Sequence, residues 1–160
     1  MNKITYLTGD ATEPISPGII CHICNNVGTW GAGFVVALSK KWPEAESAYR
    51  RVGKWELGFS QVIPTSDPNI KVCNMIAQKG IGHKNGIPPI RYEALRLCLH
   101  KLSLYANQEN ITDIHMPRIG AGLAGGDWSI IEQIIEEELT GNELNVYVYD
   151  LPNTKYKRGL

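Results

Sequence analysis

Two glycine-rich stretches hold the residues of this sequence that are best suited to binding an anion. The first, GTWGAG, contains Gly28, Gly31 and Gly33 and runs directly into an apolar, helix-forming segment. The second, RIGAGLAGG, covers residues 118–126 and also precedes a helix-forming segment. A glycine inside regular structure costs roughly 0.5–1 kcal/mol relative to alanine, so several in one loop indicate positive φ angles or close approach by another group. Backbone N–H groups of such loops, placed at a helix N-terminus, favour a bound phosphate.

The elements around these loops place them at one edge of a sheet. Strands rich in β-branched residues are predicted at 3–7, 19–24, 59–65, 70–78, 113–117 and 144–150, and helices at 33–41, 44–52, 91–106 and 128–139. This alternation is typical of an α/β domain with a mixed, largely parallel sheet. Ligands of such sheets bind outside the carboxyl ends of the strands, where both loops fall. Together the loops are suited to hold a diphosphate from both sides.

Common nucleotide motifs do not match either loop. A P-loop requires Gly-Lys-Ser/Thr at the start of the helix, and GAGFVV lacks it. A dinucleotide-binding fingerprint requires another glycine three positions after Gly33, where Val36 stands. The residues alone therefore leave two alternatives open, a phosphate-ligand site and plain turns.

Composition limits the class of protein. With 160 residues, 43% of them hydrophobic, residues 1–160 are predicted to form one domain, and we expect a monomer. The 16 basic and 16 acidic residues cancel, which argues against a bulk nucleic-acid or membrane binder but not against reading one nucleotide-like group. The segment MNKITYLTGD has no apolar core of signal-peptide length and no run approaches a membrane span, so we expect a cytoplasmic protein.

The four cysteines are predicted to be reduced and buried. Cys21, Cys24, Cys73 and Cys98 mostly lie in apolar runs. The CHIC stretch lies in a predicted strand, whereas redox C-x-x-C motifs lie at a helix start. Without a second cysteine pair or a histidine pair at zinc spacing, the sequence predicts no metal site and no cofactor.

Four segments resemble, in order, the ligand-binding motifs of one known family. They are ITYLTGDAT, HICNNVGTWGAGFVVALSKKWPEAESAY, HMPRIGAGLAGGDW and VYVYDL. These are similar to the opening strand, two ligand loops and closing strand of macrodomains, in the branch with ADP-ribose-1''-phosphate phosphatases and terminal ADP-ribose glycohydrolases. The resemblance implies a three-layer α/β/α macrodomain with ADP-ribose lying across the carboxyl ends of the strands.

The resemblance also implies which residues bind the ligand. Asp10 matches the aspartate that accepts from the adenine amino group, although a turn-forming aspartate is the alternative. Asn25 matches the asparagine near the distal ribose, with a simple loop residue as the alternative. Trp30 either lies over the ligand or closes its loop onto Pro43 and Tyr49. The other implied ligand residues are Ala11, Gly31, Ala32, Gly33, Phe34, Gly120, Ala121, Gly122, Leu123, Ala124, Tyr149, Asp150 and Leu151.

Catalysis is the point at which the sequence departs from one mechanism of the family. The terminal glycohydrolase uses a lysine and an aspartate whose positions match Gln78 and Ala124, although Lys79 is adjacent. This leaves attack by water at C1'', with Asn25 and Gln78 orienting the water. With an ordinary pKa of about 6.5, His22 is the candidate proton shuttle, and a structural histidine is the alternative.

The expected function is a hydrolase that acts at C1'' of ADP-ribose. It would remove phosphate from ADP-ribose-1''-phosphate, or ADP-ribose from a modified nucleobase or carboxylate, so its partner is ADP-ribose or an ADP-ribosylated nucleic acid or protein. A non-catalytic ADP-ribose-binding module is the alternative, and the missing lysine–aspartate pair favours it. His83, in KGIGHKNG, is a candidate to cover the distal ribose, and the basic tail KYKRGL a candidate to touch a nucleic-acid phosphate.

Overall fold

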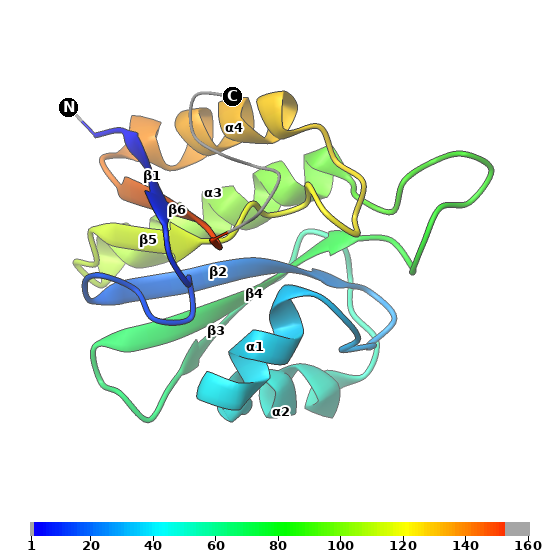
Figure 1. The fold of residues 1–160 in the computed structure, drawn as a ribbon, viewed down its shortest axis with the longest axis horizontal. Coiled ribbons are helices and arrows are strands. Elements are labelled where there is room, and N and C mark those ends of the chain that lie inside the picture. The colour runs from blue at the N-terminus through cyan, green and yellow to red at the C-terminus, as the bar shows by residue number, and fades with distance from the viewer. Residues whose placement is uncertain (1, 153–160) are drawn as a thin grey trace.

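The computed structural model describes residues 2–152 (Figure 1). The strands are β1 (Ile4–Thr8), β2 (Gly18–Asn25), β3 (Ser60–Pro64), β4 (Ile70–Gln78), β5 (Asp113–Met116) and β6 (Asn145–Asp150). The helices are α1 (Phe34–Lys41), α2 (Pro43–Val52), α3 (Tyr92–Gln108), α4 (Trp128–Glu138) and the short 3-10 helix η1 (Thr140–Asn142). Each predicted strand and helix is present, with its ends shifted by two residues at most. The basic tail lies outside the described residues.

The strands form one mixed sheet in the order β1-β6-β5-β2-β4-β3. Four of the pairings are parallel, and only β3 runs antiparallel, against β4. The carboxyl ends of β1, β6, β5, β2 and β4 therefore share one edge of the sheet. This confirms the predicted mixed, largely parallel sheet.

Helices cover both faces of the sheet and complete the three layers. Figure 1 shows α1 and α2 on one face and α3 and α4 on the other. Each face has its own core, because β2 and β4 are buried on both sides and send alternate side chains to each. The three-layer α/β/α fold predicted from the sequence is confirmed. Within residues 2–152, no helix has the length and apolar content needed to cross a bilayer.

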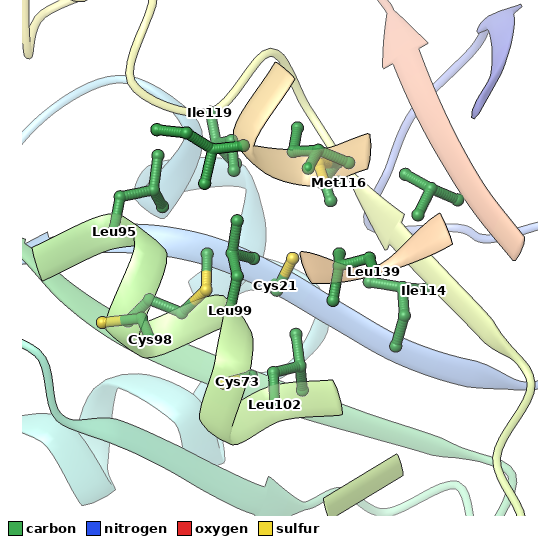
Figure 2. Close-up of a cluster of buried hydrophobic side chains, with 14 of the residues drawn as sticks. Cys21, Cys73, Leu95, Cys98, Leu99, Leu102, Ile114, Met116, Ile119 and Leu139 are labelled. Atoms are coloured by element: carbon green, nitrogen blue, oxygen red, sulfur yellow. The ribbon is translucent and has the colours of Figure 1, made fainter. Parts of the chain in front are cut away.

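The larger core lies between the sheet and α3 and α4. Leu95, Leu99 and Leu102 form the buried stripe of α3 and face Cys21 and Cys73 of the sheet (Figure 2). All four cysteines are free and buried, as predicted, and burial raises the pKa of the thiols. These thiols act as small apolar side chains.

Replacing Leu99 by alanine should strongly destabilise the fold. The side chain is fully buried, so Leu99→Ala should lower the free energy of unfolding by about 2–5 kcal/mol. Leu104→Ala on the same helix is the matched control, because this side chain is 58% exposed and its loss should cost no more than about 0.5 kcal/mol. Urea unfolding measures both. Equal losses would contradict the assigned burial of the helix faces.

Candidate functional site

A cleft of about 560 Å³ opens at the carboxyl ends of β2, β4 and β5. Its walls are the two glycine-rich loops, and its floor is the end of β2. The residues around it are His22–Asn25, Thr29–Val35, Gln78, Ile81, Gly82, Pro117–Gly120 and Gly122–Ala124. The sheet thus brings together most of the residues predicted for the diphosphate and the distal ribose.

The first glycine loop ends at the N-terminus of α1. Gly33 is the N-cap residue, with a φ of 79°, and no side chain caps this helix end. The first N–H groups of an α-helix have no partner within the helix and carry a partial positive charge. Gly31, Ala32, Gly33 and Phe34 line the cleft, so this helix end is suited to an anion.

The second glycine loop turns sharply under α4. Gly120 has a φ of 75°, and a Cβ atom there would lie 2.5 Å from Cδ1 of Ile90, so no other residue fits without a shift. The N–H of Gly126 donates to the carbonyl of Gly120 at 2.7 Å, which closes the turn. Asp127 is the N-cap of α4, and its Oδ1 accepts from the N–H of Ser129 at 2.9 Å.

Gly28 differs from the other glycines of the first loop. The sequence predicted that all three serve the ligand, but a Cβ atom on Gly28 would lie 2.0 Å from the carbonyl oxygen of Gly53. Gly28 does not line the cleft. Glycine is required at this position because the backbone of the loop lies against the backbone that follows α2, and a side chain would not fit between them.

The side chain of Asn25 holds the turn before the first glycine loop. Its Oδ1 accepts from the N–H groups of Val27 and Thr29 and from the hydroxyl of Tyr49, at 3.1, 3.2 and 2.8 Å. Its Nδ2 donates to the carbonyl of Thr29 at 2.7 Å. Asn25 lines the cleft, but these bonds make it the residue that shapes the loop.

At the end of β4 it is Gln78, and not Lys79, that lines the cleft. Gln78 is half-buried, and its Nε2 donates to the carbonyl of Gly80 at 3.2 Å. Lys79 is exposed. Successive side chains of a strand point to opposite sides, so the lysine points away when the glutamine faces the site. Lys79 therefore does not face the cleft as Gln78 does.

His22 lies beneath the first glycine loop and is only 2% exposed. Its Nε2 lies 2.5 Å from Oδ1 of Asn74, whose Nδ2 donates to the carbonyl of Ala45 and to Gln61. Oδ1 of Asn74 is thus an acceptor, so Nε2 of His22 carries the proton. Burial lowers the pKa of His22 to about 4, which keeps the ring neutral at pH 7.

Trp30 packs into the protein beside His22. The indole is 7% exposed and its centroid lies 5.3 Å from that of His22 and 5.5 Å from that of Tyr49. Its Nε1 donates to the hydroxyl of Ser39 at 2.5 Å. Of the two roles predicted for Trp30, closing the loop onto Tyr49 is the one that these contacts fulfil.

The residues predicted for adenine form a separate group beside the cleft. Asp10, Ala11 and Tyr149–Leu151 follow β1 or end β6 and do not line the cleft. Oδ1 of Asp10 accepts from the N–H and the hydroxyl of Thr12, at 2.9 and 2.8 Å, which is the turn-forming role given as the alternative. Ala121, predicted for the diphosphate, also lies outside the lining.

Arg118 joins the two groups, and the sequence reasoning did not single it out. It lines the cleft, and its Nε and Nη2 donate to the two carboxylate oxygens of Asp150 at 2.8 and 3.0 Å. Its guanidinium also lies 4.9 Å from the ring centroid of Tyr6 and 5.1 Å from that of Trp128. The hydrogen bonds to Asp150 raise the pKa of Arg118. The Asp150 side chain predicted for adenine is thus held by an ion pair.

The lining of the cleft contains few charged groups. Among the described residues that line it, Arg118 is the only one with a permanent charge, and none is a carboxylate or a lysine. Arg118 is paired with Asp150 and His22 is neutral, so the lining has no group able to act as a strong base at pH 7, and its positive character comes from the uncapped N–H groups at the start of α1. Such a lining favours an anionic ligand.

One Ser-His-Asp set lies elsewhere and has a structural role. The hydroxyl of Ser16 donates to Asp113 at 2.6 Å, and His115 is fully buried between Ser16 and Tyr149. A nucleophilic serine would instead donate to the histidine and face a cleft. Within residues 2–152, no three His, Cys, Asp or Glu side chains gather in a way that could hold a metal ion.

Comparison with known proteins identifies the class of this domain. The sequence model of the Macro domain family matches residues 21–135, so the chain belongs to the macrodomain family. It is 29% identical to the ADP-ribose 1''-phosphate phosphatase of Candida albicans, over 91% of this chain and 99% of that protein. It is 27% identical to the bovine ADP-ribose glycohydrolase OARD1, over 94% of this chain and 93% of that protein.

Other relatives differ in length or are known as structures. The chain is 27% identical to the mouse Chromodomain-helicase-DNA-binding protein 1-like over 96% of its own length, but spans only 18% of that protein. A Bacteroides thetaiotaomicron protein of unknown function is 48% identical, with a TM-score of 0.89 over 94% of this chain and 99% of that one. A Streptomyces coelicolor macrodomain is 40% identical, with a TM-score of 0.79 over 92% and 99%.

Stability should fall in acid partly because of His22. Its imidazole titrates at about 6.5 when unfolded and at about 4 when folded, so the unfolded chain binds more protons between these values. Stability is then complete above about pH 6.5 and is lost as the pH falls toward 4, by about 1.5–2 kcal/mol at pH 5. Urea unfolding at pH 7 and pH 5 should show a smaller loss in His22→Gln than in wild type. His83→Gln, at an exposed position, should keep the wild-type loss.

The ion pair between Arg118 and Asp150 should show strong coupling. Each single variant, Arg118→Gln or Asp150→Asn, leaves a largely buried polar partner and should cost about 2–4 kcal/mol of unfolding free energy. The double variant should cost clearly less than the sum of the two. Chemical unfolding of the four proteins measures the cycle, and additive losses would mean that the pair makes no net interaction.

Proposed function

We propose that this macrodomain binds ADP-ribose in the cleft and hydrolyses a bond at its C1'' carbon. The observation that carries the proposal is the convergence of the two glycine-rich loops. A Cβ atom on Gly33 of the first loop would lie 3.4 Å from Cδ1 of Leu123 in the second. The uncapped start of α1 and the cationic Arg118 face the same space, which supports a diphosphate at this place.

The order of the strands gives the ligand its direction. Asp10 follows β1, Tyr149–Leu151 lie at the end of β6, the glycine loops follow β5 and β2, and Gln78 ends β4. A ligand that lies across these ends would therefore meet the adenine residues, the diphosphate loops and Gln78 in turn. In this direction the distal ribose, with C1'', lies at the β4 side of the cleft.

The proposed reaction needs only water and the substrate. The oxygen of a water molecule forms a bond to C1'' while the bond from C1'' to the leaving oxygen or nitrogen breaks, and the proton of the water passes through solvent to the leaving group. Cleavage at such a carbon has cation-like character in the transition state. In this proposal the ligand's own diphosphate helps to hold the water.

Gln78 and Asn25 take different parts in this proposal. Gln78 lines the β4 side of the cleft and is the residue that we assign to orient the water. Asn25 is a positioning residue, because its side chain is bonded within its own loop. The proton on Nε2 of His22 is committed to Asn74, which supports the structural alternative for this histidine. A lining without a strong base predicts slow turnover.

The alternative function is a binding module for ADP-ribose without turnover. The lack of a strong base favours this alternative, since the cleft has neither a carboxylate nor a lysine among its lining residues within the described chain. The two functions differ in one measurable respect. Both require ADP-ribose binding, but only the hydrolase releases product.

Gln78→Ala should reduce turnover while binding persists. Product release would be measured on ADP-ribose-1''-phosphate, on ADP-ribosylated thymidine and on a glutamate-linked ADP-ribosyl peptide, with ADP-ribose affinity measured beside it. Loss of one oriented water should cost about tenfold or more in turnover on the substrate used, with an ADP-ribose Kd within about threefold of wild type. Asn25→Ala should weaken both, because the loop loses its support.

Gln133→Ala is the matched control, since this glutamine lies on the exposed face of α4. It should leave turnover and binding at the wild-type level. Turnover that is unchanged in Gln78→Ala would overturn the role of Gln78. Tight ADP-ribose binding with no turnover of any substrate by wild type would make the protein a binding module.

A further inference from the structure

Asn26 follows β2 directly, is half-buried and does not line the cleft. Its N–H donates to the carbonyl of Gln78, at the end of β4, at 2.9 Å. Its carbonyl accepts from the N–H of Trp55, in the chain after α2, also at 2.9 Å. Its Oδ1 accepts from the N–H of Gly80, again at 2.9 Å. One residue outside the cleft lining therefore joins β4, the chain after α2 and the loop that follows β4.

The bond to Gly80 fastens the loop at 79–91, which leaves β4 and returns to α3. This loop extends beyond the sheet beside α3 in Figure 1. Gly80 is buried at the base of the loop, and a buried N–H without a partner is costly. Within residues 2–152, its bond to Oδ1 of Asn26 is the only hydrogen bond between the loop at 79–91 and the chain between β2 and α1. Loss of this bond would release that side of the loop.

The carbonyl of Gly80 in turn holds the side chain of Gln78. Nε2 of Gln78 donates to this carbonyl at 3.2 Å. A carbonyl can only accept, so the bond fixes which end of the Gln78 amide faces Gly80. Oε1 of Gln78 has no hydrogen-bond partner within residues 2–152. Because Gln78 lines the cleft, Oε1 is the atom left to accept a hydrogen bond from a water molecule there.

The other side of the loop at 79–91 is fastened to the second glycine loop. The N–H of Ile90 donates to the carbonyl of Ala124 at 3.2 Å. Ile81 and Gly82, which follow Gly80 directly, line the cleft. The bond to Gly80 on the β2 side therefore sets where this stretch lies at the opening of the cleft.

The two adjacent asparagines support different parts of the cleft. The side chain of Asn25 bonds within the first glycine loop and to Tyr49. Asn26 bonds instead to Gln78 and Gly80, at the end of β4. Loss of the Asn25 side chain should therefore disturb the loop that binds the ligand, whereas loss of the Asn26 side chain should disturb the group that orients the water.

We propose that Asn26 is a positioning residue that fixes Gln78 for the reaction by way of Gly80. This inference rests on the proposed function, in which Gln78 orients the water. Oδ1 of Asn26 holds the N–H of Gly80, and the carbonyl of Gly80 holds Nε2 of Gln78. The circuit closes where the N–H of Asn26 donates to the carbonyl of Gln78. Both the backbone and the side chain of Gln78 thus depend on one residue that lies outside the cleft lining.

Asn26→Ala removes the acceptor and should lower kcat by about tenfold or more on the substrate that wild type hydrolyses, because a small displacement of a positioned group slows a reaction strongly. The ADP-ribose Kd should stay within about threefold of wild type, since Asn26 does not line the cleft. Asn26→Asp keeps an oxygen acceptor in a side chain of the same shape and should retain most of the turnover. Asn142→Ala is the matched control. It also removes a side-chain bond to the backbone, at the carbonyl of Glu138, but lies in η1 before the amino end of β6 and should leave kcat unchanged.

The double variant Asn26→Ala/Gln78→Ala separates positioning from a general effect on the fold. Because Asn26 acts through Gln78 in this proposal, the double variant should be no slower than Gln78→Ala alone. Losses that multiply in the double variant would overturn the inference. An unchanged kcat in Asn26→Ala, or a failure of Asn26→Asp to restore turnover, would do the same.

A signal of Gln78 itself tests the inference without turnover. In an amide NMR spectrum, the side-chain NH2 pair of Gln78 is the pair that disappears in Gln78→Ala. The bond to Gly80 should separate its two proton shifts in wild type and in Asn26→Asp, and the two shifts should move together in Asn26→Ala. An unchanged pair in Asn26→Ala would overturn the inference. A wild type that binds ADP-ribose and shows the expected signals but hydrolyses nothing would overturn the proposed hydrolysis, and would leave the positioning of Gln78 by Asn26 standing.

Discussion

Parallel pairing of β2 with β5 on one side and β4 on the other is the constraint on which the site depends. Ile19 and Ile20 pair with Ile114 and His115, so β2 and β5 run side by side and end at the same edge. The loops that follow these strands must then begin next to each other, although about 90 residues separate them in the sequence. If β5 ran antiparallel to β2, the two glycine loops would lie at opposite ends of the sheet.

The loops keep their shape because polar groups beneath them are satisfied inside the protein. Asn25 is bonded to its own turn and to Tyr49, and His22 donates to Asn74. Burying these groups without partners would be costly, so the network fixes one arrangement. The polar side chains of Asn25 and His22 at the floor of the cleft therefore hold its shape. This explains how an ordered site can exist with few groups free to act on a ligand.

The described lining of the cleft contains no carboxylate. Arg118 on its wall is paired with Asp150, and the loop at 79–91 adds the exposed side chains of Lys79 and Lys84 at the opening. This distribution favours anions at the cleft and offers no carboxylate there to act as a base.

The sequence by itself determined the elements, the mixed, largely parallel sheet and the two glycine loops, because hydrophobic periodicity and glycine placement are local signals, whereas the three layers were implied by the resemblance to macrodomains. Only the tertiary structure decided that Arg118 joins the cleft to Asp150, that Gly28 is required by contact with Gly53, and that the loop at 79–91 stands at the opening. Each of these depends on partners distant in the chain, and no local pattern encodes a distance between such partners.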